Sequence, residues 1–83
     1  MVAALMARYT IRWGEQADRT YNDLPSRIQK AVDERLDELC VDPRTGTYDK
    51  GRDQWKAAFH GGLVMYTVGE RMLLIDVLRI TAL

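Results

Sequence analysis

The chain has 83 residues, which is the length of one small domain. Hydrophobic residues make up 47% of it and charged residues 29%, so it can build a packed core and is not intrinsically disordered. Basic and acidic side chains cancel to zero net charge, which excludes a protein that binds polyanions over its whole surface. The charges are segregated, however. Residues 14–43 carry twice as many acidic as basic side chains, whereas residues 44–60 carry twice as many basic as acidic ones.

The single cysteine and the N-terminal tail limit the possible classes further. Cys40 has no partner for an internal disulfide, and we interpret it as a small buried residue near the end of a helix. One histidine and no clustered cysteines provide too few ligands for a metal site, and we expect no cofactor. Residues 1–7 are apolar but too short to span a bilayer, and they lack a signal-peptide pattern. We expect a disordered tail there, or a true start at Met6, in a cytoplasmic protein that does not contact membranes.

The N-terminal half predicts one strand and two helices. Residues 8–13 alternate between apolar and polar side chains, which is typical of a strand with one buried face. Residues 15–23 predict a short helix with acidic residues in its first turn. A longer helix begins at Pro25 and ends near Val41, because the residue before Pro43 disfavours helical backbone. Its predicted apolar face recurs at steps of three and four residues: Ile28, Ala31, Val32, Leu36 and Leu39.

The C-terminal half predicts a long loop followed by three strands. The loop at 42–53 is rich in glycine, proline and aspartate, and its length favours a functional role over a plain connection. Strands are predicted at 55–59, 63–68 and 72–80, joined by turns at two glycine-containing segments. Strict alternation in the last strand places one set of residues on a single face: Leu73, Ile75, Val77 and Arg79. Both faces of the last two strands are mostly apolar.

Together these elements predict a single α+β domain over residues 1–83. The order is βααβββ, with a mainly antiparallel sheet and two helices packed on one face. A sheet covered on one side should have a polar second face, and this sheet has little polar surface. Two explanations remain open. Either a partner helix, a partner strand or a second copy covers the second face, or the sheet curls enough to bury both faces itself.

Several short motifs resemble the RelE/ParE toxin superfamily. They are the Tyr-Thr-Ile-Arg-Trp strand, the Leu-Pro start of the long helix and its Asp42-Pro43 end, followed by Trp-Lys, Gly61-Gly62 and Val-Met-Tyr-Thr-Val. The resemblance covers residues 8–80. It implies a toxin of a type II toxin–antitoxin system that is wrapped by a cognate antitoxin. RelE-like members cleave messenger RNA on the ribosome, whereas ParE-like members poison DNA gyrase.

The basic residues that the resemblance implies are only partly present. Lys56 matches the first basic position, but Ala58 stands at the second. Leu63 stands where an arginine usually follows the glycine turn, and the C-terminal segment with a last arginine and a tyrosine has no counterpart before Leu83. The resemblance therefore implies a reduced or atypical catalytic set. Tyr66 is interpreted as a packed sheet residue.

Other residues are candidates to complete a site. We name Lys56, His60 and Arg79 as candidate catalytic residues, and Lys50 and Arg52 as candidate phosphate-binding residues of a metal-independent endoribonuclease. Each also has a simpler interpretation: a turn residue for His60, solvated side chains for the lysines, and pairing with Asp76 or Glu70 for Arg79. Whether the protein is an enzyme stays open. The alternatives are a ParE-like gyrase inhibitor, a non-catalytic interaction module on the toxin fold, and an unrelated α+β domain that dimerises through its sheet.

Overall fold

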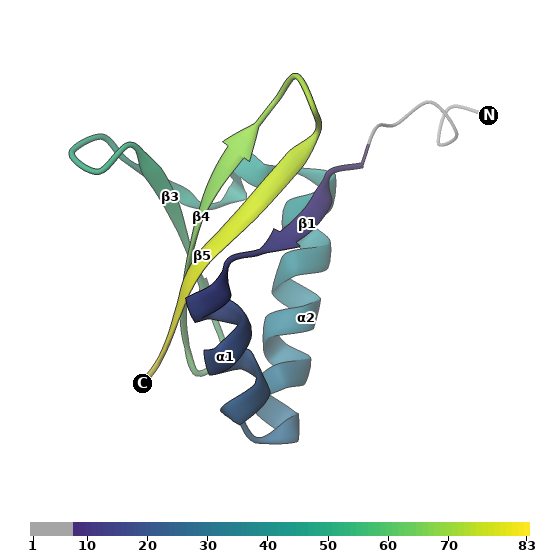
Figure 1. Cartoon of the computed structure of the whole chain (residues 1–83), viewed down its shortest axis with the longest axis vertical. Helices are drawn as coiled ribbons and strands as arrows, with labels where there is room; N and C mark the ends of the chain where they lie inside the picture. Colours follow the sequence, from purple (N-terminus) through teal and green to yellow (C-terminus); the bar gives the residue numbers. More distant parts are fainter. Residues whose placement is uncertain (1–7) are drawn as a thin grey trace.

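A computed structural model of the chain describes residues 8–83, so the expectation for the tail 1–7 lies outside the described residues. Strand β1 is followed by two helices and four further strands (Figure 1). The bounds are β1 Thr10–Trp13, α1 Glu15–Asp23, α2 Ser26–Val41, β2 Thr47–Asp49, β3 Gln54–Phe59, β4 Gly62–Gly69 and β5 Leu74–Ala82. A short 3-10 helix at Pro43–Thr45 joins α2 to β2.

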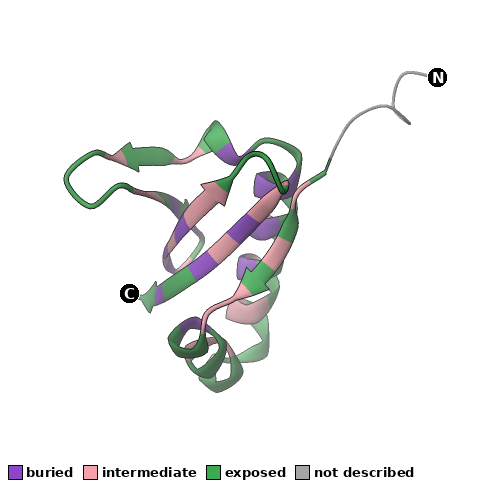
Figure 2. Cartoon of the chain, turned by 45° about the horizontal axis from the view of Figure 1, so that its top comes forward, coloured by how far each residue is buried: buried purple, intermediate pink, exposed green. Residues whose placement is uncertain are grey.

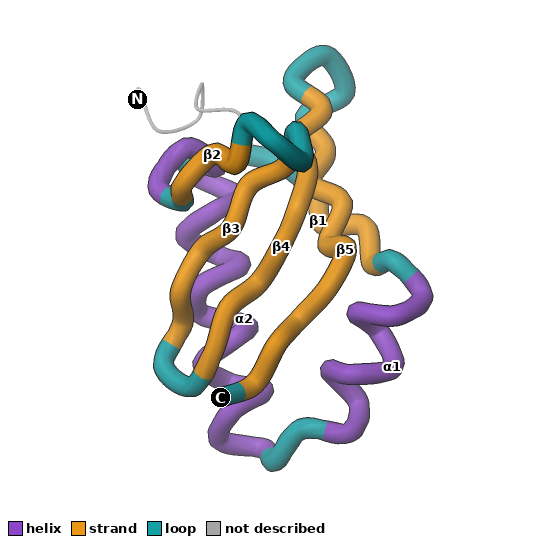
Figure 3. Tube along the Cα trace, turned by 90° about the vertical axis from the view of Figure 1, so that its left-hand side faces the viewer, coloured by secondary structure: helices purple, strands orange, loops and turns teal. Residues whose placement is uncertain are grey.

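The strands form one five-stranded sheet in the order β1-β5-β4-β3-β2. Strand β1 pairs with β5 in parallel, and the other three pairs are antiparallel. Helices α1 and α2 lie on one side of this sheet, and the opposite face carries no element of the described chain (Figures 1 and 3). The predicted α+β class, the mainly antiparallel sheet and the placement of both helices are confirmed.

Helix α2 forms as its spacing predicts. It begins one residue after Pro25, whose φ of −59° and ψ of 150° keep it outside the helix as the capping residue. The apolar stripe buries Val32, Leu36 and Leu39 against the sheet. Cys40 is buried in the last turn, as predicted, and this burial raises the pKa of its thiol. The Cys40 carbonyl accepts a hydrogen bond of 2.8 Å from the Tyr9 backbone N–H, which ties the helix end to the start of β1.

The prediction of a long loop at 42–53 is wrong for residues 43–49. The short 3-10 helix and β2 lie in this segment, and β2 pairs with β3 through Thr47↔Lys56 and Asp49↔Gln54. A strand of three residues is too short to show an alternating pattern, which is why the sequence did not reveal it. The Asp49 carboxylate accepts hydrogen bonds from the backbone N–H groups of Gly51 and Arg52, so the hairpin turn is closed by its own side chain.

The last strand also differs from the prediction in two respects. It begins at Leu74 rather than at residue 72, because Leu73 adopts a φ of 51° in the preceding turn. Its register then shifts: Met65 pairs with Arg79 while Tyr66 pairs with Val77, so Leu78 is an extra residue in a β-bulge. Strict alternation therefore fails after Val77, and the prediction that Arg79 shares a face with Ile75 and Val77 is wrong.

The core lies between the helices and the facing side of the sheet. Figure 2 shows buried positions separated by more exposed ones along β5, which is the pattern of a strand with one covered face. Tyr66 and Val64 of β4 are completely buried. The Tyr66 hydroxyl donates a hydrogen bond of 2.7 Å to the Pro43 carbonyl, and its ring stacks on Trp55 at 6.4 Å. Tyr66 is thus packed in the sheet, as predicted, and holds the segment after α2 against β4.

Candidate functional site

The face of the sheet opposite the helices, here called the open face, carries a row of two basic side chains with a methionine between them. Lys56 of β3 pairs with Met65 of β4, and Met65 pairs with Arg79 of β5. Directly paired residues in neighbouring strands project on the same side of a sheet. The residues that follow them along their strands, Ala57, Tyr66 and Ile80, are buried in the core, so Lys56, Met65 and Arg79 project to the other side. This set is called the basic row.

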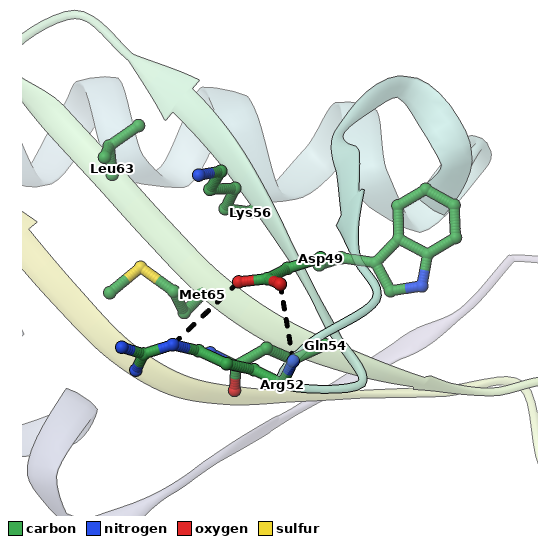
Figure 4. Close-up of a pocket in the computed structure, with 7 residues that line it drawn as sticks. Asp49, Arg52, Gln54, Lys56, Leu63 and Met65 are labelled. Atoms are coloured by element: carbon green, nitrogen blue, oxygen red, sulfur yellow. Dashed lines mark hydrogen bonds and ion pairs between the residues drawn. The ribbon is translucent and has the colours of Figure 1, made fainter.

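Beside the basic row lies a shallow hollow of about 400 Å³, here called the Lys56 hollow. Its lining residues come from β2, the β2–β3 turn, β3 and β4: Asp49, Arg52, Gln54, Trp55, Lys56, Leu63 and Met65. Figure 4 shows Arg52 extended along Met65, with the Asp49 carboxylate between Arg52 and Lys56. The turn therefore adds a third cation to the two of the basic row.

The carboxylates near this surface are already engaged. Asp76 binds Arg12 with an N–O distance of 2.5 Å, and Glu70 binds Arg44 at 2.9 Å. Asp49 accepts backbone hydrogen bonds from the turn, and its ion pair with Arg52 is long, at 3.9 Å. Within residues 8–83, Lys56 and Arg79 form no ion pair. Pairing of Arg79 with Asp76 or Glu70 is thus absent, and both cations of the basic row are free to meet an anionic ligand.

The chain is similar to solved structures of toxins. No protein-family model and no curated protein sequence matches this chain. Among solved structures, one chain of the RelBE2 toxin–antitoxin complex from Mycobacterium tuberculosis superposes with a TM-score of 0.84. The two chains are 26% identical, and the match covers 94% of each. This chain belongs to the RelE-like toxin superfamily. The isolated RelE toxin of E. coli has the same fold, with a TM-score of 0.78 and 19% identity over 89% of this chain and 83% of that one.

In this RelE-like fold, His60 lies apart from the basic row. Strand β3 ends at Phe59, which pairs with Gly62, and Gly61 closes the turn with a φ of 118°. A strand continuing straight to His60 is therefore ruled out. His60 lines another hollow of about 390 Å³ between α2 and β3, together with Glu34. The structure does not bring His60 to Lys56 and Arg79.

The two positions at which the RelE/ParE resemblance implies cations are apolar surface in this chain. Leu63 lines the Lys56 hollow, and Ala58 pairs with it across β3 and β4. The Ala58 carbonyl accepts a hydrogen bond of 2.9 Å from Arg35 of α2. Arg35 also binds Glu38 and the Thr45 carbonyl, so its charge is used inside the fold. The open face consequently has a mixed character, with three cations around an apolar centre.

Several residues of the site were not singled out from the sequence. Asp49 and Gln54 flank the β2–β3 turn, and Met65 lies at the centre of the basic row. Asp49 was hidden in a strand too short to detect, whereas the apolar outer face of β4 was the signal that pointed to Met65. Lys50 lies in the turn, outside the lining of the Lys56 hollow. Within the described residues, no group of three or more His, Cys, Asp or Glu side chains could hold a metal.

Membrane insertion through a helix has no support in the described part of the chain. Neither α1 nor α2 has the length and apolar content that a bilayer-spanning helix requires.

Proposed function

We propose that this chain is the toxin of a type II toxin–antitoxin system and that it acts on translation by cleaving messenger RNA at the ribosome. The match to a chain of the RelBE2 toxin–antitoxin complex supports the toxin assignment and a cognate antitoxin as partner. Such a toxin would act in the cytoplasm. Gyrase inhibition is not proposed, because both solved structures described above are RelE proteins rather than ParE proteins.

The observation that carries the proposed cleavage is the pair of free cations in the basic row. Lys56 and Arg79 flank Met65 on the open face, and Arg52 approaches from the turn. Lysine and arginine side chains neutralise phosphate oxygens, and arginine does so with two parallel hydrogen bonds. A backbone phosphate of an RNA strand laid across this row would contact two or three positive charges. That contact holds the strand and stabilises the extra charge that develops during cleavage.

The proposed reaction is internal attack by the ribose. The 2′-oxygen forms a bond to phosphorus while the bond from phosphorus to the 5′-oxygen breaks, which leaves a 2′,3′-cyclic phosphate and a 5′-hydroxyl. Water takes the proton of the 2′-hydroxyl, and the Lys56 ammonium gives a proton to the leaving 5′-oxygen and regains one from water. Arg79 and Arg52 hold the charged phosphate oxygens. With water as the base, this set would support slow cleavage unless the ribosome contributes groups of its own.

A second candidate function is supported by the apolar residues of the same surface. Leu63 lies in the Lys56 hollow where the resemblance implies an arginine, and Ala58 lies beside it. A non-catalytic interaction module on the toxin fold would need such an apolar surface more than it needs charge. An antitoxin segment or a second copy of the chain, pairing through the sheet, would cover it.

Induced expression separates the two functions. We expect tightly induced expression of the chain in bacteria to arrest growth, and coexpression of the neighbouring antitoxin gene to relieve the arrest. Sequencing of RNA 5′-hydroxyl ends should show cleavage inside translated messages. The change Lys56→Gln or Arg79→Gln should lower cleavage by about 10²-fold, the effect of losing one preorganised charge contact.

The matched control is Lys30→Gln on the exposed side of α2, which should cleave as the unchanged chain does. Normal growth with soluble, folded protein would contradict the toxin assignment and favour the interaction module. Growth arrest without new 5′-hydroxyl ends would contradict cleavage alone. Cleavage unaffected by both row substitutions would contradict the assignment of the site.

A further inference from the structure

A second, smaller hollow of about 230 Å³ continues the open face toward α1. Here called the Arg79 hollow, it is lined by Gln16, Arg52, Gln54, Met65, Leu78 and Arg79. Three of these residues, Arg52, Gln54 and Met65, also line the Lys56 hollow. The two hollows therefore adjoin, and Arg52 reaches both. Together they form one groove across β3, β4 and β5 that ends at the first turn of α1.

The Arg79 hollow has a positive lining without acidic side chains. Arg79 forms no ion pair within residues 8–83, and Arg52 has a side chain that is 74% exposed with only the long contact to Asp49. Asp76, which neighbours the hollow along β5, is held by Arg12. Two guanidinium groups facing one hollow provide several N–H donors in a planar arrangement that fits phosphate oxygens.

The β-bulge in β5 provides independent support for a ligand site. Leu78 is the extra residue, so Leu78 and Arg79 are both exposed and both line the Arg79 hollow. The Leu78 side chain is 37% exposed, so it can contact a ligand. Bulges are frequent beside functional sites, where they redirect a side chain. Here the bulge places an arginine and an apolar side chain next to each other at the wall of a groove.

We propose that the Arg79 hollow binds the nucleotide adjacent to the one at the Lys56 hollow, so that the groove takes single-stranded RNA across two consecutive phosphates. This inference rests on the proposed function for the choice of RNA. Met65 and Leu78 offer an apolar floor to the flat face of an unpaired base, which a duplex keeps stacked inside. Gln16 and Gln54 each carry an amide donor and a carbonyl acceptor. These groups can form hydrogen bonds with the donors and acceptors on the edge of a base.

Binding of an uncleavable strand tests this subsite apart from cleavage. The probe is a fluorescein-labelled, 2′-O-methyl hexauridylate, which lacks the attacking hydroxyl, and binding is measured by fluorescence anisotropy on the full chain. We expect Arg79→Gln to weaken binding about tenfold and to reduce the slope of log affinity against log salt by about 1. Gln16→Glu, which adds a carboxylate at the far end of the groove, should weaken binding by a similar factor. The control Arg27→Gln on α2 should change neither quantity.

Two further probes identify the ligand. An abasic hexamer with the same phosphates should bind at least several-fold more weakly, because it cannot use the apolar floor and the amides. Equal binding of the abasic strand, or no effect of both Arg79→Gln and Gln16→Glu, would overturn the subsite. A glutamate-rich peptide that binds through Arg79 when the hexamer does not would overturn it too, in favour of a protein ligand. Absence of growth arrest combined with the expected binding pattern would reject the proposed toxicity and leave the subsite standing.

Discussion

The two faces of β4 show how one strand serves two purposes. Val64 and Tyr66 point toward the helices and are completely buried, whereas Leu63 and Met65 point to the open face and stay partly exposed. All four are apolar enough for a core, so composition does not distinguish the faces. The helices decide which side becomes the interior. The residues on the other side are relieved of packing constraints and can form a groove with Lys56 and Arg79.

Charge follows the same division. The outer surface of α2 is acidic, with Asp33, Glu34, Asp37 and Glu38 exposed or partly exposed along it. The open face presents the basic row together with Arg52. Segregated charge of this kind attracts ligands of opposite sign to different sides of one neutral molecule. A polyanion and a cationic partner segment would therefore approach opposite sides of the sheet.

The largest expected effect is the difference in stability between substitutions on the two faces of β4, at the adjacent residues Tyr66 and Met65. Tyr66→Ala should cost about 3–5 kcal/mol of unfolding free energy, because it leaves a cavity and an unpaired Pro43 carbonyl. Met65→Ala on the open face should cost only about 1 kcal/mol, since its side chain is only partly buried. Urea denaturation measures both. Similar losses at the two positions would mean that the open face is as much a core as the helix face.

A glycine pair tests how tightly the segment after α2 is held. A side chain at Gly46 would collide with the Tyr66 hydroxyl and approach the Lys56 carbonyl to 2.7 Å, and both are fixed by the sheet. Gly46→Ala should therefore cost about 1–3 kcal/mol and shift β2 away from β3. Gly51→Ala in the hairpin turn meets only the Asp49 carboxylate at 3.5 Å and should leave stability unchanged. Denaturation and amide exchange of β2 would report the difference, and equal stabilities would refute the tight packing.

Arg35 on the helix side can be compared with Arg79 on the open face, because the charged group of Arg35 forms hydrogen bonds within the fold. Its side chain is only 17% exposed and bonds the Ala58 carbonyl, the Thr45 carbonyl and Glu38. Arg35→Gln should lower the unfolding free energy by about 1–2 kcal/mol through these lost hydrogen bonds. Arg27→Gln, exposed on the same helix, should be neutral. If Arg79→Gln on the open face destabilised the fold as much as Arg35→Gln, its assignment as a ligand-binding residue would be weakened.

The smallest expected effect is a pH dependence of the unfolding free energy, to which two buried groups of the helix face contribute. Burial raises the pKa of the Tyr66 phenol and that of the Cys40 thiol. Their neutral forms are favoured in the fold, so this stability is present below the ordinary pKa values, about 8.5 for cysteine and 10 for tyrosine, and is lost as pH rises through the folded values. Urea midpoints should fall above about pH 9. Tyr66→Phe should flatten the upper part of the decline, and an unaltered profile would argue that Tyr66 contacts water.

The predicted elements succeeded where a pattern extended over several turns or alternations. The apolar stripe of α2 from Ile28 to Leu39 and the alternation of Tyr9, Ile11 and Trp13 each predicted an element and the side that packs against the core. The predictions failed where one local event altered the pattern. The three-residue strand β2 was too short to leave a signal, and the extra residue Leu78 reversed the expected face of Arg79. A bulge is set by pairing with another strand, so no periodicity within β5 could reveal it.

The sequence by itself determined the class of the fold, the long helix and the burial of Cys40, because these depend on hydrophobic periodicity along the chain. It also determined which basic residues were available. Only the tertiary structure decided which of them meet. The register of β3, β4 and β5 brought Lys56 and Arg79 into one row, the hairpin turn added Arg52, and the Gly61 turn placed His60 elsewhere. The physical reason is that a site is made by contacts between different strands and turns. Such contacts produce no periodic pattern in the sequence from which they could be predicted.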